Sequence, residues 1–247
     1  MEANLCDKAI LITGATSGIG QNAAYEFAKE SATLVLVGRN RKKLEFMKSQ
    51  LGDKVHIFEY DLRDLEHIEN IFSFAKSQNI KFDFMVHCAG IAKNSIIRAN
   101  DIEDMDEVMK VNCFSFVELG KFFCLKKYSN PGGAVVALSS IASLLNDKGM
   151  VQYSASKAAL NSVIKTMSKE FLKKQIRVNA ILPAYVNTAM FTAGESQIDN
   201  FEEELMINQP LGIIPTENIV GIIKFLLSDY GKYITGELLV VSAGMQF

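Results

Sequence analysis

The decisive stretch of this sequence is Ala9-Ile10-Leu11-Ile12-Thr13-Gly14-Ala15-Thr16-Ser17-Gly18-Ile19-Gly20. It begins with an apolar run and continues with three glycines in the pattern Gly-x-x-x-Gly-x-Gly. In the turn between a first strand and a first helix, such glycines bring a pyrophosphate to the free N–H groups and the positive dipole end of the helix. We expect Gly14 to permit the tight turn, Gly18 to let the phosphate approach and Gly20 to let the helix pack closely. The further candidate cofactor contacts in the same turn are Thr16, Ser17 and Ile19.

Apolar runs recur along the rest of the chain and alternate with amphipathic stretches. The runs are Ala9–Ile12, Leu34–Val37, Val55–Phe58, Phe82–His87, Ala134–Leu138, Arg177–Leu182 and Glu237–Val241. Helical periodicity occurs over Ala23–Lys29, Leu65–Ser77, Met105–Lys127, Ser154–Lys173 and Asn218–Leu227. Several runs consist of continuous Val, Ile and Leu, which is typical of parallel strands covered by helices on both faces. The alternation predicts an α/β fold with one doubly wound parallel sheet, in a single domain over residues 1–247.

The composition is that of an ordinary globular protein, with 49% hydrophobic and 22% charged residues, which excludes disordered and collagen-like chains. The 26 basic and 28 acidic residues nearly balance, so nothing predicts a nucleic-acid partner. Four cysteines without a Cys-x-x-Cys pair predict neither a metal site nor a disulfide framework. The acidic start and the lack of an apolar run near about 18 residues predict a cytoplasmic protein without a signal peptide or membrane span.

The segment Ala189–Pro210 interrupts the alternation between the sixth apolar run and the last helix. A long insertion inside a compact domain is more often a functional lid than an idle loop. We therefore predict a substrate lid over about 189–210. The alternative is a surface excursion that covers the edge of the sheet.

Tyr153 and Lys157 are four residues apart on a predicted helix, so their side chains project from one face. An ammonium about 4 Å from a phenol is worth about 4 kcal/mol at an effective dielectric constant near 20. That energy would lower the pKa of the phenol from about 10 to roughly 7. The pair is then a candidate proton donor and acceptor for interconverting a carbonyl and an alcohol. Taken alone, the same spacing also fits a solvated or half-buried helix face.

Thr13-Gly-x-x-x-Gly18-x-Gly20 and Tyr153-Ser-Ala-Ser-Lys157 together resemble the short-chain dehydrogenase/reductase family. The resemblance runs from about Lys8 to the C-terminus and is strongest for the branch that includes 3-oxoacyl-acyl-carrier-protein reductases. It implies a single Rossmann domain with a seven-stranded sheet, NAD(P) as cofactor and often a homotetramer. In the family's pattern the serine 13 residues before the tyrosine is catalytic. That spacing selects Ser140, whose hydroxyl would stabilise charge on the substrate oxygen, rather than Ser139. Asn112 matches an asparagine that holds a water in the family's proton relay.

The end of the expected second strand bears on cofactor choice. It reads Val37-Gly38-Arg39-Asn40-Arg41 and lacks the carboxylate that usually selects NAD. Because the planar guanidinium of Arg39 can pair with a 2′-phosphate, we predict NADP(H) in preference to NAD. The alternative is that Arg39 and Arg41 are solvated charges that open the next helix. The remaining cofactor contacts implied by the resemblance are Asp61 and Leu62 at the adenine, Ala89 and Gly90 after the fourth strand, and Pro183 and Thr188 in the loop on the nicotinamide side.

The sequence departs from the family's pattern at three places. Asn, Gly and Asp-Gly are usual where this chain has Cys88, Ala184 and Ser242-Ala243. None of these changes removes a candidate catalytic group, so an active enzyme remains the expectation.

The residues together predict an oxidoreductase that transfers a hydride between a nicotinamide and a small carbonyl or secondary-alcohol substrate. One alternative is a 3-oxoacyl-acyl-carrier-protein reductase proper. A second is a non-catalytic nucleotide-sensing protein, which would have lost part of the catalytic set. A third is a sugar-nucleotide epimerase or dehydratase, which usually has a larger C-terminal domain.

Charge gives opposing indications about an acidic carrier protein. Ala189–Pro210 contains five acids and no Lys or Arg, which disfavours such a partner. Lys126-Lys127 and Lys173-Lys174, expected at the ends of the helices that flank the site, favour one. Because these lysines also complement helix dipoles without any partner, we predict a freely diffusing substrate.

The helix predicted over Met105–Lys127 is apolar around more than one face. A symmetric partner is the economical place to bury the extra surface, so a homo-oligomer is expected. The alternative is a deeply buried helix in a monomer.

Overall fold

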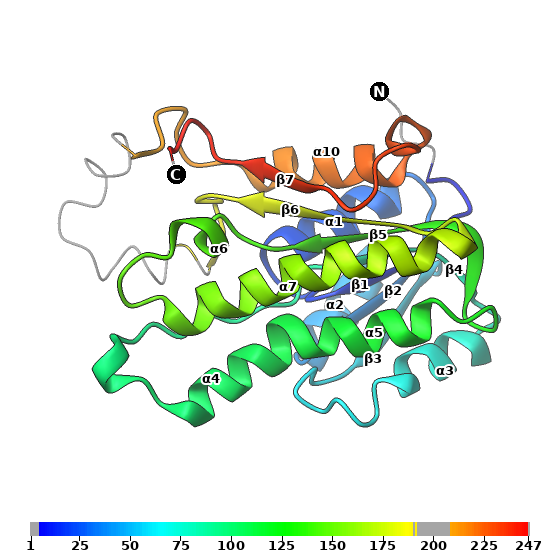
Figure 1. Cartoon of the computed structure of the whole chain (residues 1–247). Helices are drawn as coiled ribbons and strands as arrows, with labels where there is room; N and C mark the ends of the chain where they lie inside the picture. Colours follow the sequence, from blue (N-terminus) through cyan, green and yellow to red (C-terminus); the bar gives the residue numbers. More distant parts are fainter. Residues whose placement is uncertain (1–4, 190, 192–207, 247) are drawn as a thin grey trace.

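The structure, a computed structural model, describes residues 5–189, 191 and 208–246. Within these residues one sheet contains seven strands, in the order β3-β2-β1-β4-β5-β6-β7, and every neighbouring pair is parallel (Figure 1). The strands are β1 (Ala9–Thr13), β2 (Thr33–Gly38), β3 (Val55–Glu59), β4 (Phe82–His87), β5 (Ser129–Leu138), β6 (Arg177–Pro183) and β7 (Leu238–Val241). The predicted doubly wound α/β fold is confirmed.

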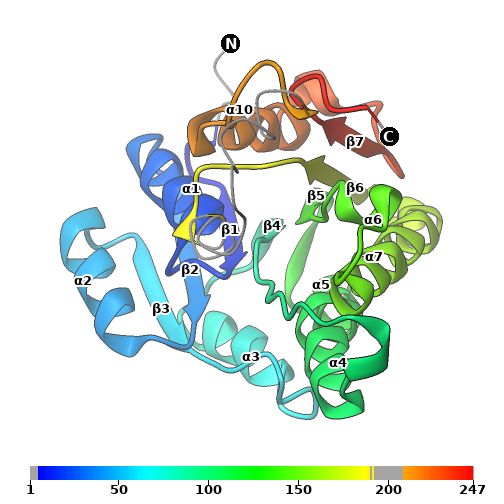
Figure 2. The same cartoon turned by 90° about the vertical axis from the view of Figure 1, so that its left-hand side faces the viewer.

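Helices cover both faces of the sheet (Figure 2). One face packs against α1 (Gly18–Lys29), α2 (Arg41–Leu51) and α10 (Thr216–Leu227). The other packs against α3 (Glu69–Ser77), α5 (Ser115–Phe123) and α7 (Val151–Glu170), with α4 (Ile102–Met109) on the same side. The remaining short segments are α6 (Ala142–Leu145), η1 (Ile97–Ala99), η3 (Phe171–Lys174) and η4 (Asp229–Gly231).

The continuous apolar runs follow from this two-sided burial. Successive side chains of a strand point to opposite faces, so both faces need apolar residues. In β1, Ile10 and Ile12 join the core under α1 and α10, whereas Leu11 joins the core under α5 and α7. All three side chains are completely buried.

The helix predicted over Met105–Lys127 is interrupted. It begins earlier, as α4, passes through a π-helical segment η2 (Lys110–Phe114), and continues as α5 to Phe123. A π-helical turn inside an α-helix is rare and is frequent at functional sites. Here the wider turn contains Asn112, a candidate site residue.

The predicted lid lies largely outside the described residues, because 190 and 192–207 are not among them. In the described part of the chain, no helix combines the length and the apolar character needed to cross a bilayer.

Candidate active site

Residues that follow β1, β4, β5 and β6 meet at one edge of the sheet, as the carboxyl ends of parallel strands must. They surround a cavity of about 480 Å³. The predicted site residues that line it are Ser17, Gly18, Ile19, Gly90, Ser140, Tyr153, Lys157, Pro183 and Thr188. The fold thus brings the glycine turn and the Tyr-x-x-x-Lys pair, far apart in sequence, to one hollow.

Tyr153 and Lys157 project from the first turns of α7 into this cavity. Lys157 is almost completely buried and donates a hydrogen bond to the carbonyl oxygen of Leu138 at 2.7 Å. Its Nζ lies 5.7 Å from the centroid of the Tyr153 ring. Burial lowers the pKa of the Lys157 ammonium to about 8, although the nearby thiols of Cys88 and Cys113 act in the opposite direction.

The pKa of Tyr153 differs from the expectation. Burial raises it above the usual value near 10, and a hydrogen bond with Ser140 acts against that rise. The predicted lowering by Lys157 is not found, because the ammonium is directed to the Leu138 carbonyl rather than to the phenol oxygen. Tyr153 is therefore a protonated phenol at neutral pH.

Ser140 is held by its own loop and by α7. The N–H of Ala142 donates to Ser140 Oγ at 3.1 Å, and Ser143 Oγ donates to the Ser140 carbonyl at 2.7 Å. Asn161 Nδ2 donates in turn to Ser143 Oγ at 2.8 Å. Asn161 and Ser143 are both buried. This chain of hydrogen bonds ties the Ser140 loop to the helix that carries Tyr153.

The sequence analysis did not identify Ser143 or Asn161. A signal was present, since Tyr153, Lys157 and Asn161 follow one another at intervals of four and so share a helix face. An asparagine in a helix interior has low helix propensity, which was a second hint that it has a specific partner.

Asn112 lies in the π-helical segment and is completely buried. Its Oδ1 accepts from the Ile91 N–H at 2.8 Å, and its Nδ2 donates to the Ile91 carbonyl and to Ser156 Oγ, each at 2.9 Å. A Cβ placed on Gly90 would lie 3.4 Å from both Asn112 Oδ1 and Lys157 Nζ. Asn112 and Lys157 therefore converge behind Gly90, on the cavity side of α7.

The glycine turn has the tight geometry that was predicted. A Cβ on Gly14, which has φ +67°, would lie 2.6 Å from the backbone nitrogen of Ala89. A Cβ on Gly20 would lie 2.5 Å from the carbonyl oxygen of Gly14. Ser17 precedes α1 and its side chain makes no capping hydrogen bond, so the first N–H groups of the helix remain open for an anion.

The end of β2 lies beside this turn. A Cβ on Gly38 would lie 2.8 Å from Thr16 Cγ2, so Thr16 covers the end of the strand. Arg39 follows and is exposed. The pKa of Asp61 is lowered chiefly by hydrogen bonding to Arg63, and the positive charge of Arg39 lowers it to a smaller extent. Asp61 Oδ2 accepts from Arg63 Nε at 2.9 Å, so the predicted adenine contact is engaged by a neighbouring side chain.

The loop after β6 adjoins the glycine turn. A Cβ on Gly18 would lie 3.1 Å from Thr188 Cγ2. The Pro183 carbonyl accepts from the Ile141 N–H at 3.1 Å, which joins this loop to the Ser140 segment. Leu62 and Ala89 are buried in the core under α3, α5 and α7, and neither lines the cavity.

His87 has a role that the sequence analysis missed. It is completely buried at the end of β4, and its Nδ1 lies 2.8 Å from the hydroxyl of Thr13, its register partner on β1. Burial lowers the pKa of the imidazole to about 3, so it is neutral. The adjacent Cys88 replaces the family's asparagine, and the imidazole–hydroxyl bond braces the centre of the sheet.

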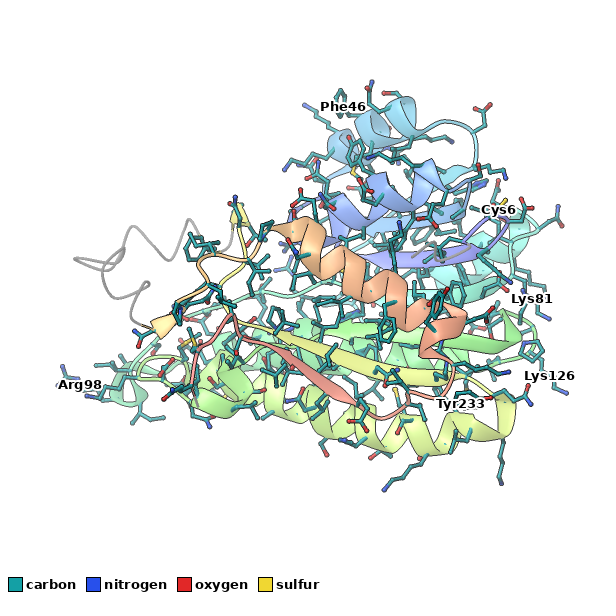
Figure 3. The ribbon with its side chains drawn as sticks, turned by 90° about the horizontal axis from the view of Figure 1, so that it is seen from above. Cys6, Phe46, Lys81, Arg98, Lys126 and Tyr233 are labelled. Carbon is teal, nitrogen blue, oxygen red and sulfur yellow. The ribbon has the colours of Figure 1, made fainter. Side chains whose placement is uncertain are left out.

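The two lysine pairs lie at the ends of the expected helices, after α5 and after α7, but these ends are far from the cavity. Lys126 and Lys127 precede β5, and Lys173 and Lys174 precede β6, so both pairs are at the amino ends of the strands, opposite the cavity. Figure 3 shows Lys126 at the far end of the molecule from Arg98, which belongs to η1 in the loop after β4. Lys127 pairs with Glu69 at 2.8 Å, and Lys174 donates to the carbonyl of Cys124 just after α5.

Comparisons with known proteins agree with this architecture. Residues 14–246 match the family model described as enoyl-(acyl carrier protein) reductase. The chain is 30% identical to a 3-oxoacyl-acyl-carrier-protein reductase of Aquifex aeolicus, over 99% of this chain and 100% of that one.

Among solved structures, two show the same fold over nearly the whole chain. A protein from Brucella melitensis, titled short-chain dehydrogenase/reductase, has a TM-score of 0.92, 25% identity and full coverage of both chains. A 4-hydroxyisoleucine dehydrogenase complexed with NADH has a TM-score of 0.87 and 28% identity, covering 96% of this chain and 98% of the other. The chain therefore belongs to the short-chain dehydrogenase/reductase family, and it is an NAD(P)-dependent oxidoreductase acting on C=O and CH–OH groups.

Proposed function

We propose that the chain is an NADP-dependent reductase or dehydrogenase in which Tyr153 exchanges a proton with the oxygen of a small carbonyl or alcohol substrate. The observation that carries this proposal is the placement of Ser140, Tyr153 and Lys157 on the cavity that the glycine turn also lines. A protonated phenol is the form that gives a proton to a substrate oxygen during reduction. The Ser140 hydroxyl donates a hydrogen bond to the same oxygen and stabilises its developing charge.

The residues around the cavity fit a dinucleotide. Gly14, Gly18 and Gly20 leave the space, and the open N–H groups at the start of α1 supply donors for a pyrophosphate. Pro183, Thr188 and Lys157 line the cavity, where Pro183 and Thr188 would border the nicotinamide and Lys157 would bind the adjoining ribose. When bound, the cofactor supplies or accepts the hydride.

A preference for NADP(H) rests on Arg39. Its guanidinium makes no ion pair with any residue in the described ranges, whereas Arg41 pairs with Glu45 and Glu59. β2 ends in Gly38 without a carboxylate that would repel a 2′-phosphate. An exposed arginine in this position is available for the phosphate.

The lysine positions support a freely diffusing substrate over a carrier-linked one. Lys127 forms an ion pair with Glu69, and Lys174 donates to the carbonyl of Cys124 just after α5. Both lysines lie at the edge of the sheet away from the cavity. A carrier delivering its substrate to this chain's own cavity would not contact them. A reducing cytoplasm suits the four cysteines, since no disulfide joins two cysteines among the described residues.

The test is NADPH oxidation against a panel of ketones, β-ketoacyl thioesters and sugars. Tyr153→Phe is expected to reduce kcat by at least about a hundredfold while the Kd for NADPH stays within a few-fold, since only the proton donor is lost. Lys157→Ala is expected to lower kcat and also to weaken the binding of NADPH. NADPH binding without turnover of any substrate would favour the nucleotide-sensing alternative.

The carrier question has its own measurement. The kcat/KM for a carrier-linked β-ketoacyl substrate is compared with that for its short thioester analogue, at low and high salt. We expect no large carrier advantage. An advantage that collapses with salt and in Lys127→Glu or Lys174→Glu would contradict the proposal.

A further inference from the structure

We propose that this site selects substrates whose reacting carbonyl has no negatively charged group close to it, so that neutral, largely apolar ketones and alcohols are accepted and keto acids are rejected. The inference rests on the proposed function for the identity of the reacting group. It concerns the wall of the cavity, not the catalytic set.

The wall beyond the glycine turn and the catalytic residues is mostly apolar. It comes from the segment after β5, the start of α7, the loop after β6 and the C-terminal segment. Its apolar members are Ile141, Ala142, Leu145, Met150, Tyr185, Val186, Phe191 and Met245. The rings of Tyr185 and Phe191 pack with centroids 5.6 Å apart. Such a wall suits hydrocarbon substituents on the substrate.

The cavity wall contains few charged side chains, and they do not favour an anionic substrate. Among the described residues that line the cavity, Lys157 is the one cation, and its ammonium donates to the Leu138 carbonyl. The acid in the lining is Asp147, which forms no ion pair with another described residue. A substrate carboxylate would thus meet no free positive charge and one negative charge.

The segment 190–207, most of which lies outside the described residues, brings no basic side chain to this balance. The sequence from 190 to 207 contains Glu195, Asp199 and Glu202–Glu204, and no Lys, Arg or His. Whatever their position, they add no cation. Lys148 lines an adjoining hollow with Ser95 and Ile97, so the selection applies to charge near the carbonyl and not to a distant group.

A carboxylate that leaves water for such a wall loses its hydration and gains no cationic partner there, which is strongly unfavourable. The negative charge of Asp147 adds repulsion, although its exposure allows solvent to screen it. We therefore expect kcat/KM for a neutral substrate to exceed that for the matched acid by at least about tenfold, since a lost charge-assisted bond is worth that much.

The experiment compares methyl acetoacetate with acetoacetate, and methyl pyruvate with pyruvate, as NADPH-dependent substrates. Met150→Lys places a cation in the wall and is expected to raise the relative kcat/KM for the acids by about tenfold or more. Asp147→Asn is expected to raise it by a few-fold. Leu172→Lys adds the same charge on an exposed residue of η3, away from the cavity, and is the matched control with no expected change.

Binding separates this inference from the proposed function. Calorimetric Kd values for each pair are measured on Tyr153→Phe in the presence of NADPH, where reduction is slow and the nicotinamide ring carries no positive charge that would attract the acids. Tighter binding of the neutral member of each pair, with a preference that moves toward the acid in Met150→Lys, supports the selection. This holds even if turnover is absent and the proposed function fails. Equal or tighter binding and turnover of the acids would overturn the selection while leaving the proposed function intact.

Discussion

The ammonium of Lys157 lies 2.7 Å from the carbonyl oxygen of Leu138, the last residue of β5. This bond attaches α7 to the strand that leads into Ser140, and it places a cation in the interior with a neutral partner. Burial without a carboxylate explains why the pKa of Lys157 is lowered to about 8.

The lowered pKa predicts how stability depends on pH. Between about 8 and 10.5 the unfolded chain holds a proton on Lys157 that the folded chain has released, so the free energy of unfolding rises with pH in this range. Relative to Lys157→Met, the wild type should gain up to about 3 kcal/mol from pH 7.5 to pH 10, measured by urea unfolding. Lys165→Met, an exposed lysine of the same helix, controls for loss of charge. A pH-independent difference between wild type and Lys157→Met would refute the prediction.

Asn161 is expected to act as a positioning residue for Ser140. Asn161→Ala removes the donor that orients Ser143 Oγ toward the Ser140 carbonyl, so kcat should fall roughly tenfold, the cost of about one hydrogen bond in a positioned loop. The KM for NADPH should stay within about twofold. Asn161→Asp keeps the volume but not the donor, and should behave like the alanine variant. Full activity in Asn161→Asp would mean that the residue serves packing alone.

Cofactor selection is tested at Gly38. Gly38→Asp places a carboxylate beside the ribose, which repels a 2′-phosphate and accepts from a 2′-hydroxyl, so the ratio of kcat/KM for NADH to that for NADPH should rise at least about tenfold. Because any Cβ at this position approaches Thr16 Cγ2, Gly38→Ala measures the steric cost and should leave the ratio unchanged. A wild type that already prefers NADH would contradict the role of Arg39.

Self-association is predicted from a narrower surface than the sequence suggested. About half of the apolar side chains between 105 and 127 are buried within the chain, among them Phe116, Leu119 and Phe123, and several others, such as Phe122, are half-buried. Phe114 and Val117 remain 40% and 36% exposed on the outer side of η2 and α5. We expect a dimer or tetramer at micromolar concentration by light scattering, and a fall in mass for Val117→Glu. A wild-type monomer would show that the helix is simply buried in a single chain.

Much of the fold was predictable because its signals are local. The seven apolar runs became the seven strands, since a strand buried on two faces must be apolar at every position. The one clear shift is in β5, which begins at Ser129 rather than Ala134, because its first residues are polar and pair irregularly with β4. Hydropathy does not mark such residues.

The candidate site was only partly predictable. The glycine turn and Tyr153/Lys157 could be chosen by spacing, because a turn and a helix face are defined by neighbours along the chain. The Ser143–Asn161 bond and the His87–Thr13 pair join residues 18 and 74 positions apart, and no local pattern announces them. The four lysines were correctly expected at helix ends, but a helix end does not reveal which edge of the sheet it reaches.

By itself, then, the sequence determined the alternation of strands and helices, the phosphate-binding turn and the reactive pair, because each depends on spacing within a few residues. Only the tertiary structure decided that Lys157 is directed to Leu138 and leaves Tyr153 protonated, that a π-helical turn aims Asn112 at Ile91, and that the cavity wall is apolar. Those properties arise from burial and from contacts between distant segments, whose desolvation and geometry exist only once the chain has folded.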